Sequence, residues 1–157
     1  MIYTYGFTQR GIAHAKRNLV CQDAHAIREI NENLCVAAVA DGLGSELYSD
    51  IASRIAVDVA IDVCSEEINE NKKDRDIICA IKKAFIKALE AIQIRAMQDQ
   101  RDINQYDTTL SLAVLKENNL FFGHSGDSGI IALGEDGKFY NVTKQQRDSE
   151  GRVFPLC

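Results

Sequence analysis

Two hydrophobic periods alternate along the chain and divide it into three parts. In the first part, residues 2–8 alternate aromatic and polar positions, and residues 24–30 and 34–40 flank Asn31-Glu32-Asn33. Alternation and short apolar runs bounded by turn residues are typical of strands, so we expect an opening strand followed by a β-hairpin. Residues 9–20 are polar and basic, which predicts a loop.

The middle of the chain has the period of an amphipathic α-helix. Over residues 48–68, apolar side chains recur every four positions, which predicts a helix with one apolar face. A second helix is expected over residues 76–100, with lysines on its opposite side, and its polar far end, residues 98–106, is expected to fray into a loop. The recurring apolar residues are Ile51, Ile55, Val59 and Val63 in the first helix and Ile77, Ile81, Phe85, Leu89 and Ile92 in the second.

The two-residue period returns after the second helix. It predicts strands at residues 108–116, 120–124, 129–133 and 138–142, with turns at Asn118-Asn119 and at residues 135–137. Residues 143–157 are polar with a short apolar end and receive no assignment. Strands, then two helices, then strands again indicate an α+β fold in layers with mostly antiparallel sheets.

Composition limits the class of protein. A chain of 157 residues, 46% hydrophobic and 26% charged, is long enough for one domain with a real core. The net charge of -5 argues against a nucleic-acid partner, and no apolar run approaches the ~20 residues of a membrane span. The five cysteines include no C-x-x-C pair, and no signal peptide opens the chain, so we expect reduced thiols in a cytoplasmic protein without a zinc site.

Asp41 lies at the mouth of the apolar run 34–40 and is followed by Gly42 and Gly44. A carboxylate beside backbone that bends freely is a suitable ligand for a hard cation, and the Gly42 carbonyl can turn toward the same ion. The alternative is an ordinary strand-to-helix turn in which Asp41 and Ser45 cap the helix.

Two other segments carry acids near strand ends. Asp23 comes just before the first hairpin, and Asp127 lies in residues 123–129, where three glycines interrupt an otherwise regular hairpin. Glycine weakens strand pairing unless the backbone must approach something closely, so this segment is either a site or a wide loop with a bulge.

Four short motifs in this order resemble the metal-dependent protein phosphatases, the PPM or type 2C family. The variant is similar to the bacterial branch, because Gly11-Ile12-Ala13-His14 precedes the Cys-Gln-Asp motif, and the resemblance covers nearly the whole chain. The motifs are Gln22-Asp23-Ala24, then Ala40-Asp41-Gly42-Leu43-Gly44-Ser45, then Asp107-Thr108-Thr109-Leu110, and finally Gly126-Asp127-Ser128.

The resemblance implies an antiparallel β-sandwich flanked by two long helices, with two Mg²⁺ or Mn²⁺ ions and a weaker third one at one end. The residue matching Asp41 bridges both ions, the carbonyl matching Gly42 binds one, and Asp127 matches the third position. Asp23 would support the site, so Asp41 and Asp23 are the expected catalytic residues. In the family, a metal-bridging water attacks phosphoserine or phosphothreonine of a phosphorylated protein substrate. Oxygen ligands suit Mg²⁺ or Mn²⁺ over Zn²⁺.

This chain departs from the family pattern around the first motif. Gln22 replaces a glutamate, so an ion there would bind through water. The usual phosphate-binding arginine falls on Asn18, which makes Arg17 the candidate for that role, with His14 or Lys16 as substitutes and a solvated basic loop as the alternative. Leu43 replaces a histidine that donates a proton in some relatives, so the leaving group would be protonated by water or another side chain.

Two further expectations concern residues near the strands. Thr108 and Thr109 are expected to pack behind the site as strand residues, and His124 is expected to be a hydrogen-bonded histidine at a strand end. The family also has two later metal-binding aspartates downstream of the Gly-Asp-Ser motif. Neither is assigned here, because Asp136-Gly137 is too close to Asp127 and is expected in a hairpin turn.

We therefore expect a single domain over residues 1–157 that is the N-terminal portion of a phosphatase domain, incomplete at its C-terminus and inactive alone. Its unpaired strand edges predict self-association, and exchange of strands between copies is one route to it. The expected function is a metal-dependent serine/threonine protein phosphatase. The alternative is a non-catalytic pseudophosphatase that binds phosphoproteins or serves as a scaffold.

Overall fold

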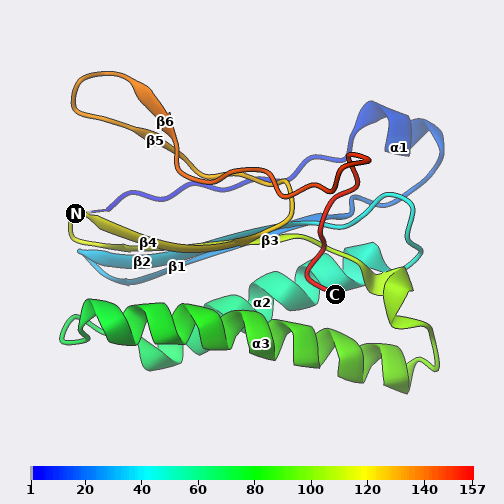
Figure 1. Ribbon diagram of the computed structural model, residues 1–157, viewed down its shortest axis with the longest axis horizontal. Coiled ribbons are helices and arrows are strands. Elements are labelled where there is room, and N and C mark those ends of the chain that lie inside the picture. Colours follow the sequence, from blue (N-terminus) through cyan, green and yellow to red (C-terminus); the bar gives the residue numbers. More distant parts are fainter. Residues whose placement is uncertain (1) are drawn as a thin grey trace.

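The computed structural model describes residues 2–157 as three layers, with a four-stranded antiparallel sheet in the middle (Figure 1). Two long helices cover one face of this sheet, and a small hairpin with extended segments lies over the other face. The sheet contains β1 (Asp23–Asn31), β2 (Leu34–Asp41), β3 (Leu110–Lys116) and β4 (Asn119–Ser125) in that order, and the helices are α2 (Ser49–Glu67) and α3 (Asp74–Gln98).

Both hairpins of the sheet follow from local sequence. β1 pairs with β2 from Asp23 opposite Asp41 to the Asn31 end, where the Asn31 side chain accepts a hydrogen bond of 2.9 Å from the Asn33 backbone N–H. This Asx-type bond stabilises the predicted turn. The β3–β4 turn is one residue earlier than expected, because Glu117 adopts the left-handed conformation (φ 54°) and Asn119 already pairs with β3.

The core lies between the sheet and the helices, as the periods predict. Every second residue of β2 and β3 is buried against α2 and α3. The buried face of α3 contains the predicted Ile77, Ile81 and Ile92 together with several alanines, whereas the predicted isoleucines and valines of α2 are half-buried beside a buried row that is rich in alanine. The buried alanines are Ala52, Ala56 and Ala60 in α2 and Ala80, Ala84, Ala88 and Ala96 in α3.

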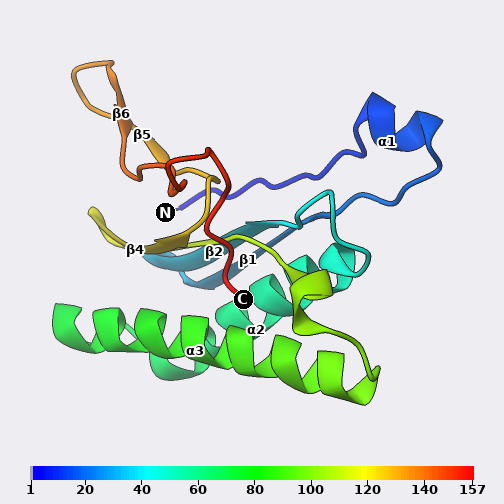
Figure 2. The ribbon, with the colours of Figure 1, turned by 45° about the vertical axis from the view of Figure 1, so that its right-hand side comes forward.

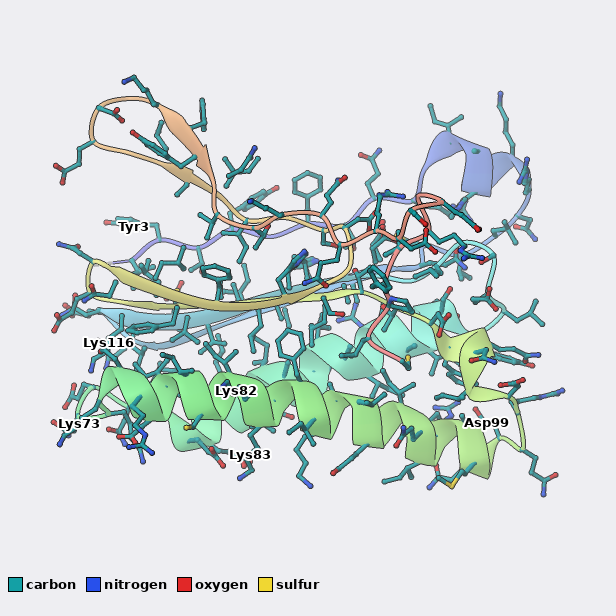
Figure 3. The ribbon with its side chains drawn as sticks, viewed as in Figure 1. Tyr3, Lys73, Lys82, Lys83, Asp99 and Lys116 are labelled. Carbon is teal, nitrogen blue, oxygen red and sulfur yellow. The ribbon has the colours of Figure 1, made fainter. Side chains whose placement is uncertain are left out.

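These small side chains let the two helices lie close together, and α3 also approaches β4 closely. A Cβ added at Gly123 would lie 2.6 Å from Phe85 of α3, so the strand needs glycine there. The outer side of α3 carries lysines, as expected, and also exposes Ile78, Ile86 and Ile94. Figure 3 shows Lys82 and Lys83 on this helix, and both are exposed. Lys83 forms an ion pair with Glu67 at the end of α2.

The predicted strand at residues 2–8 is wrong. The segment is extended, but its described backbone pairing is one hydrogen bond of 3.0 Å from Ile2 to the Glu32 carbonyl. Tyr3, Tyr5 and Phe7 are largely exposed, because the segment crosses over β1 and has no neighbouring strand with which to form a ladder. Gly6 allows the close crossing, since a Cβ there would lie 2.6 Å from the His25 ring.

Two expected loops contain short helices. The basic loop at residues 9–20 includes α1 (Ile12–Lys16), and the polar stretch after α3 includes the 3-10 helix η1 (Ile103–Tyr106). Tyr106 is fully buried and donates a hydrogen bond of 2.6 Å to Asp99, which anchors this connection against the end of α3.

The outer layer contains β5 (Ile131–Leu133) and β6 (Phe139–Asn141), which are shorter than the predicted strands. After β6 the chain returns across the end of the sheet toward the helices (Figures 1 and 2). The Leu156 N–H donates to the Thr108 carbonyl at 2.7 Å, and Leu156 and Cys157 pack against the core.

The expected α+β class, with antiparallel sheets and two long helices, is confirmed. The outer layer of the expected sandwich is a two-stranded sheet within residues 2–157. None of the helices described in that range combines the length and hydrophobicity that a membrane crossing requires.

Candidate active site

Asp23 and Asp41 face each other across the open end of the first hairpin. They are direct partners in the β1–β2 register, at the first residue of one strand and the last residue of the other. Directly opposed residues of an antiparallel pair lie about 5 Å apart, so two acids here form a repulsive pair unless a positive charge or a proton joins them.

Two threonines hold the Asp41 backbone in place. The Asp41 N–H donates to the Thr109 hydroxyl at 2.9 Å, and the Thr109 N–H donates back to the Asp41 carbonyl at 2.9 Å. Thr108 donates its hydroxyl to the same carbonyl at 3.2 Å. Both threonines are fully buried. They lie behind the site as predicted, and they fix the direction in which β2 ends.

The turn after Asp41 requires glycine. The Gly42 N–H donates to the Gln22 carbonyl at 3.1 Å, and an added Cβ would lie 2.5 Å from the Ser49 carbonyl oxygen. The following N–H, on Leu43, donates to the Asp107 carbonyl at 3.0 Å. The turn is therefore clamped between the start of β1, the start of α2 and the segment before β3.

Asp127 belongs to the same neighbourhood because of Gly126. This glycine has a φ of +108°, and an added Cβ would lie 2.4 Å from the Thr109 side chain. The Ser128 hydroxyl lies 3.0 Å from the Thr109 hydroxyl, so one threonine contacts both the end of β2 and the Gly-Asp-Ser loop. The backbone of the glycine-rich segment therefore approaches Thr109 closely. This agrees with the first of the two interpretations of the sequence, in which the glycines allow a close approach.

The surroundings of Asp41 raise its pKa. Partial burial raises the pKa of Asp41 to about 6, and the charge of Asp23, a hydrogen bond with Asp23 and the charge of Asp127 add to the effect. The charge of His14 acts in the opposite direction. Asp23 and Asp41 also line a hollow of about 400 Å³, together with Ser128 and the extended residues Phe7, Thr8 and Gln9. Asp23 and Asp41 therefore share one hollow, whereas Asp127 lines a neighbouring hollow that also includes Ser128, and its charge reaches Asp41.

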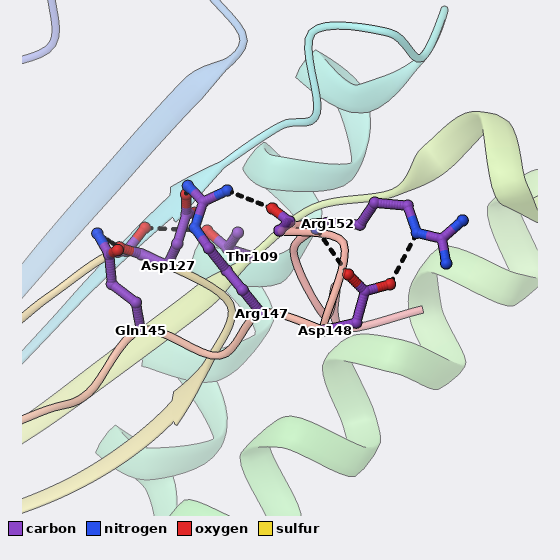
Figure 4. Close-up of polar contacts among 8 residues, drawn as sticks. Thr109, Asp127, Gln145, Arg147, Asp148 and Arg152 are labelled. Atoms are coloured by element: carbon purple, nitrogen blue, oxygen red, sulfur yellow. Dashed lines mark hydrogen bonds and ion pairs between the residues drawn. The ribbon is translucent and has the colours of Figure 1, made fainter.

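Besides His14, the basic residue Arg147 lies near these carboxylates. It was not identified from the sequence. Its guanidinium forms an ion pair with the Asp127 carboxylate (Figure 4). Arg147 lies in residues 143–157, where the sequence showed no strand or helix period and no family motif. No local signal could have identified it, because its partner is 20 residues away along the chain.

Arg17 lies apart from this ion pair. It follows α1 as the C-terminal capping residue and is exposed. Within residues 2–157, no hydrogen bond or ion pair joins the Arg17 side chain to Asp23, Asp41 or Asp127. A phosphate-binding role for Arg17 stays a prediction, and His14 is the basic residue of α1 whose charge Asp41 senses.

The Gln22 side chain stabilises the fold through hydrogen bonds. Its amide nitrogen donates to the Ser49 hydroxyl at 2.7 Å and to the Glu46 carbonyl at 3.2 Å, which holds the start of α2. Its amide oxygen is buried and has no described partner. His124 is similarly half-satisfied, since Nδ1 lies 2.8 Å from the Ser111 hydroxyl while Nε2 is buried without a described partner.

The donor set fits a hard cation only in part. Carboxylates of Asp41 and Asp127 and the carbonyl of Gly42 are oxygen ligands, the type that Mg²⁺ and Mn²⁺ prefer. In the described part of the chain, however, no three histidine, cysteine, aspartate or glutamate side chains are grouped closely enough to hold a metal ion. These residues supply a part of a divalent-ion centre, and further ligands are needed to complete it.

An antiparallel layered α+β fold with aspartates at one end of the sheet is the arrangement expected of the type 2C phosphatases. Residues 10–153 match the family model described as "Protein phosphatase 2C". The chain belongs to this family, as the four motifs predicted. No curated protein sequence matches it significantly.

Several solved structures share the fold. A bacterial serine phosphatase carrying an arginine-to-lysine mutation matches with a TM-score of 0.68 and 16% identity, over 82% of this chain and 50% of that one. RsbX in complex with magnesium matches with a TM-score of 0.57 and 16% identity, over 81% and 53%. The Mycobacterium tuberculosis serine/threonine phosphatase PstP/Ppp matches with a TM-score of 0.57 and 20% identity, over 78% and 55%. The chain thus spans about half the length of these structures.

Proposed function

We propose that this chain is part of a metal-dependent serine/threonine protein phosphatase that binds Mg²⁺ or Mn²⁺ at Asp41 and Gly42. The observation that supports the proposal is the placement of Asp23 and Asp41 in one hollow at the end of the sheet, where the charge of Asp127 reaches Asp41, in a member of the phosphatase 2C family. A phosphorylated protein is the proposed substrate, and a cytoplasmic location remains a prediction.

The charge of the site supports a cation-dependent reaction. A phosphate monoester is anionic and hydrolyses very slowly, so its approach to three carboxylates requires positive charge to be brought in. Bound divalent ions would supply that charge and lower the pKa of a coordinated water. In this chain, Asp41 and the Gly42 carbonyl would hold an ion, Asp23 would orient the Asp41 carboxylate, and Asp127 would contribute to a weaker third position.

Basic residues of the α1 region are the proposed phosphate contacts. Arg17 is the residue nearest to the family position in sequence, and His14 is the one whose charge reaches Asp41. A guanidinium binds phosphate through two parallel hydrogen bonds, which an imidazole cannot do. Replacing each residue by alanine and comparing the KM for a phosphopeptide separates the two assignments.

The length of this chain relative to the solved structures that it matches supports a further proposal. Residues 1–157 would act as one unit within a longer phosphatase domain. The chain spans about half of the solved structures that it matches, and its described ligands are incomplete. We expect the isolated chain to bind Mn²⁺ through Asp41 but to turn over p-nitrophenyl phosphate poorly.

The test compares the longest natural polypeptide that carries these residues with its Asp41→Asn variant. Mn²⁺-dependent hydrolysis of p-nitrophenyl phosphate or a phosphopeptide, lost in the variant, is the expected result. Absence of metal-dependent turnover in the unaltered polypeptide would refute the phosphatase assignment.

A non-catalytic scaffold is the second candidate, and specific contacts favour it. The Gln22 amide holds α2 and is not available as an acidic ligand, Leu43 replaces a histidine, and Arg147 already neutralises Asp127. A scaffold that binds phosphoproteins should keep its affinity for a phosphopeptide when Asp41 is changed to asparagine, whereas an enzyme should lose its activity.

A further inference from the structure

A regular row of side chains lies on the outer side of α3. It consists of every fourth residue of the helix from Ile78 to Ile94 and reads isoleucine, lysine, isoleucine, glutamate, isoleucine. Ile78, Ile86 and Ile94 are 46%, 57% and 54% exposed, and Lys82 and Glu90 between them are exposed as well. Isoleucine is among the residues that proteins bury most often, so three exposed isoleucines on one ridge of a helix indicate a contact surface.

The row is self-complementary about its middle residue, Ile86. Lys82 and Glu90 lie four residues before and after it and carry opposite charges. If two copies of α3 lie antiparallel around a twofold axis beside Ile86, Lys82 of each copy faces Glu90 of the other. The same symmetry brings Ile78 of each copy to Ile94 of the other. Charge and hydrophobic character therefore match along the whole row when the partner is a second copy of this chain.

The spacing of the row also suits the packing of one helix against another. Side chains four residues apart form a ridge inclined to the helix axis, and two such ridges interdigitate when the axes cross at about −50°. Lys82, Ile86 and Glu90 occupy the middle of the ridge, where the two helices would approach most closely. The helix is 25 residues long, and its opposite side packs on the core through residues such as Ile77 and Ile81, so the ridge has a rigid support.

A hollow beside the row provides space for side chains of a second copy. It has a volume of about 490 Å³ and lies between α3 and the edge strand β4. Ile78, Lys82 and Ile86 line it from the helix, and Phe122, which is 44% exposed, lines it from the strand. In the antiparallel arrangement, Ile94 of the other copy approaches the Ile78 end of this hollow.

Lys82 is the lysine of α3 that lacks an ion pair within residues 2–157. Lys83 pairs with Glu67, and Lys87 pairs with Glu90 at 2.6 Å. The Lys87–Glu90 pair is about half exposed, and such a pair contributes little to stability because water screens it. A carboxylate can accept from more than one donor, so Glu90 remains able to bind a second ammonium group. Lys82 and Glu90 are therefore the charges that a second copy would bring together.

We propose that this row, together with the hollow beside it, is the contact through which two copies of the chain form an antiparallel, twofold-symmetric dimer. The proposal does not depend on the metal centre, and the contact is made by side chains of α3 rather than by the backbone edges of the sheet. One pair of crossed helices buries less than the ~800 Å² that each partner contributes to a stable interface of standard size. The dimer is therefore weak, and we expect a Kd of about 10–100 µM.

The test is sedimentation velocity of the 157-residue chain at concentrations below and above this Kd. Lys82→Glu and Glu90→Lys should each weaken dimerisation about tenfold, because each replaces both symmetric ion pairs by pairs of like charge. An equimolar mixture of the two variants should dimerise about as well as the unaltered chain, since opposite charges face each other again in the mixed dimer. This recovery is expected only if positions 82 and 90 of different copies meet.

Lys144→Glu is the matched control. Lys144 is exposed and follows β6 in the outer layer, so this variant has the same net charge as Lys82→Glu but leaves the row unchanged. Equal weakening of dimerisation by the two variants would overturn the proposal, and so would failure of the mixture to recover. All the substituted side chains are exposed, so the core stays unaltered, and circular dichroism checks that each variant is folded.

A substitution at the centre of the row provides a second measurement. Ile86→Asn should weaken dimerisation at least about tenfold, because it places a polar amide in the middle of an apolar contact. Association that persists unchanged in Ile86→Asn and in Lys82→Glu would assign the contact to the strand edges β1 and β4 and refute the dimer proposed here. A chain that stays monomeric at every concentration would refute it as well.

Discussion

Replacing Asp41 by asparagine should stabilise the metal-free protein at neutral pH. The pKa of Asp41 is raised to about 6 from 3.8, chiefly by burial and by the charge of Asp23. Ionising a group whose pKa is higher in the folded state than in the unfolded state weakens the folded state. The asparagine has no charge to repel Asp23 or Asp127 and keeps a polar group of almost the same shape.

The magnitude follows from the size of the shift. A shift of about two units corresponds to about 3 kcal/mol, since one unit is about 1.4 kcal/mol. Asp41 retains contact with solvent, which screens the interaction, so we expect a discounted effect of about 1 kcal/mol. With the raised pKa, the favourable contribution is fully present below about pH 4 and is lost as the pH rises through about 6.

Urea unfolding followed by circular dichroism, in EDTA at pH 4 and at pH 7.5, measures this effect. The difference between Asp41→Asn and the unaltered chain should be close to zero at pH 4 and about 1 kcal/mol in favour of the variant at pH 7.5. Taking the difference cancels other titrating groups such as Asp107, whose pKa burial also raises to about 6. Glu32→Gln, at the exposed hairpin turn, is the control and should show no such trend.

Mn²⁺ should reverse the order of stability. A bound ion stabilises only the chain that can hold it, so Mn²⁺ should raise the unfolding free energy of the unaltered chain and leave that of Asp41→Asn unchanged. The reasoning is refuted if Asp41→Asn is no more stable than the unaltered chain at pH 7.5 without metal. It is equally refuted if the two respond alike to pH.

Three other predictions concern the backbone of the site and the sheet edges. Gly42→Ala should lower the free energy of unfolding by about 2 kcal/mol, because its Cβ would lie 2.5 Å from the Ser49 carbonyl oxygen. Gly44→Ala is the control and should change the free energy of unfolding little, because its Cβ would contact only the Gln22 side chain, at 3.6 Å. Thr109→Val should lower the free energy of unfolding, measured with urea, by about 1–3 kcal/mol, because it leaves the Asp41 N–H without its acceptor. A loss below about 0.5 kcal/mol would show that water replaces the hydroxyl. The isolated chain should self-associate in light scattering through the edge strands β1 and β4, and a stable monomer at all concentrations would contradict this.

The helices and the central hairpins could be predicted because their signals are local. The four-residue period of α2 and α3 and the turn residues between β1 and β2 lie within single elements. Local signals do not show whether residues 2–8 form a strand, because a strand needs a neighbour with which to pair. Alternation at Tyr3, Tyr5 and Phe7 looks the same whether or not a neighbouring strand exists, and here the segment crosses over β1 with its aromatic side chains exposed.

The site was predictable to the extent that its residues lie in recognisable motifs. The motifs led to Asp23, Asp41 and Asp127, and the register of β1 with β2 brings the first two face to face. The Arg147 contact depends on the return of the chain across the end of the sheet, which no local pattern encodes. The use of Gln22 to hold α2 is likewise a tertiary contact.

The alanines between α2 and α3 restrict how this chain can diverge. Ala56, Ala60, Ala84 and Ala88 are completely buried, and a Cβ added at Gly123 of β4 would lie 2.6 Å from Phe85 of α3. A larger residue at one of these positions would displace α3 and with it the strand that leads into Gly126-Asp127-Ser128. Homologous sequences should therefore keep small residues along this seam or change them in compensating pairs, even where the metal-binding acids have been lost.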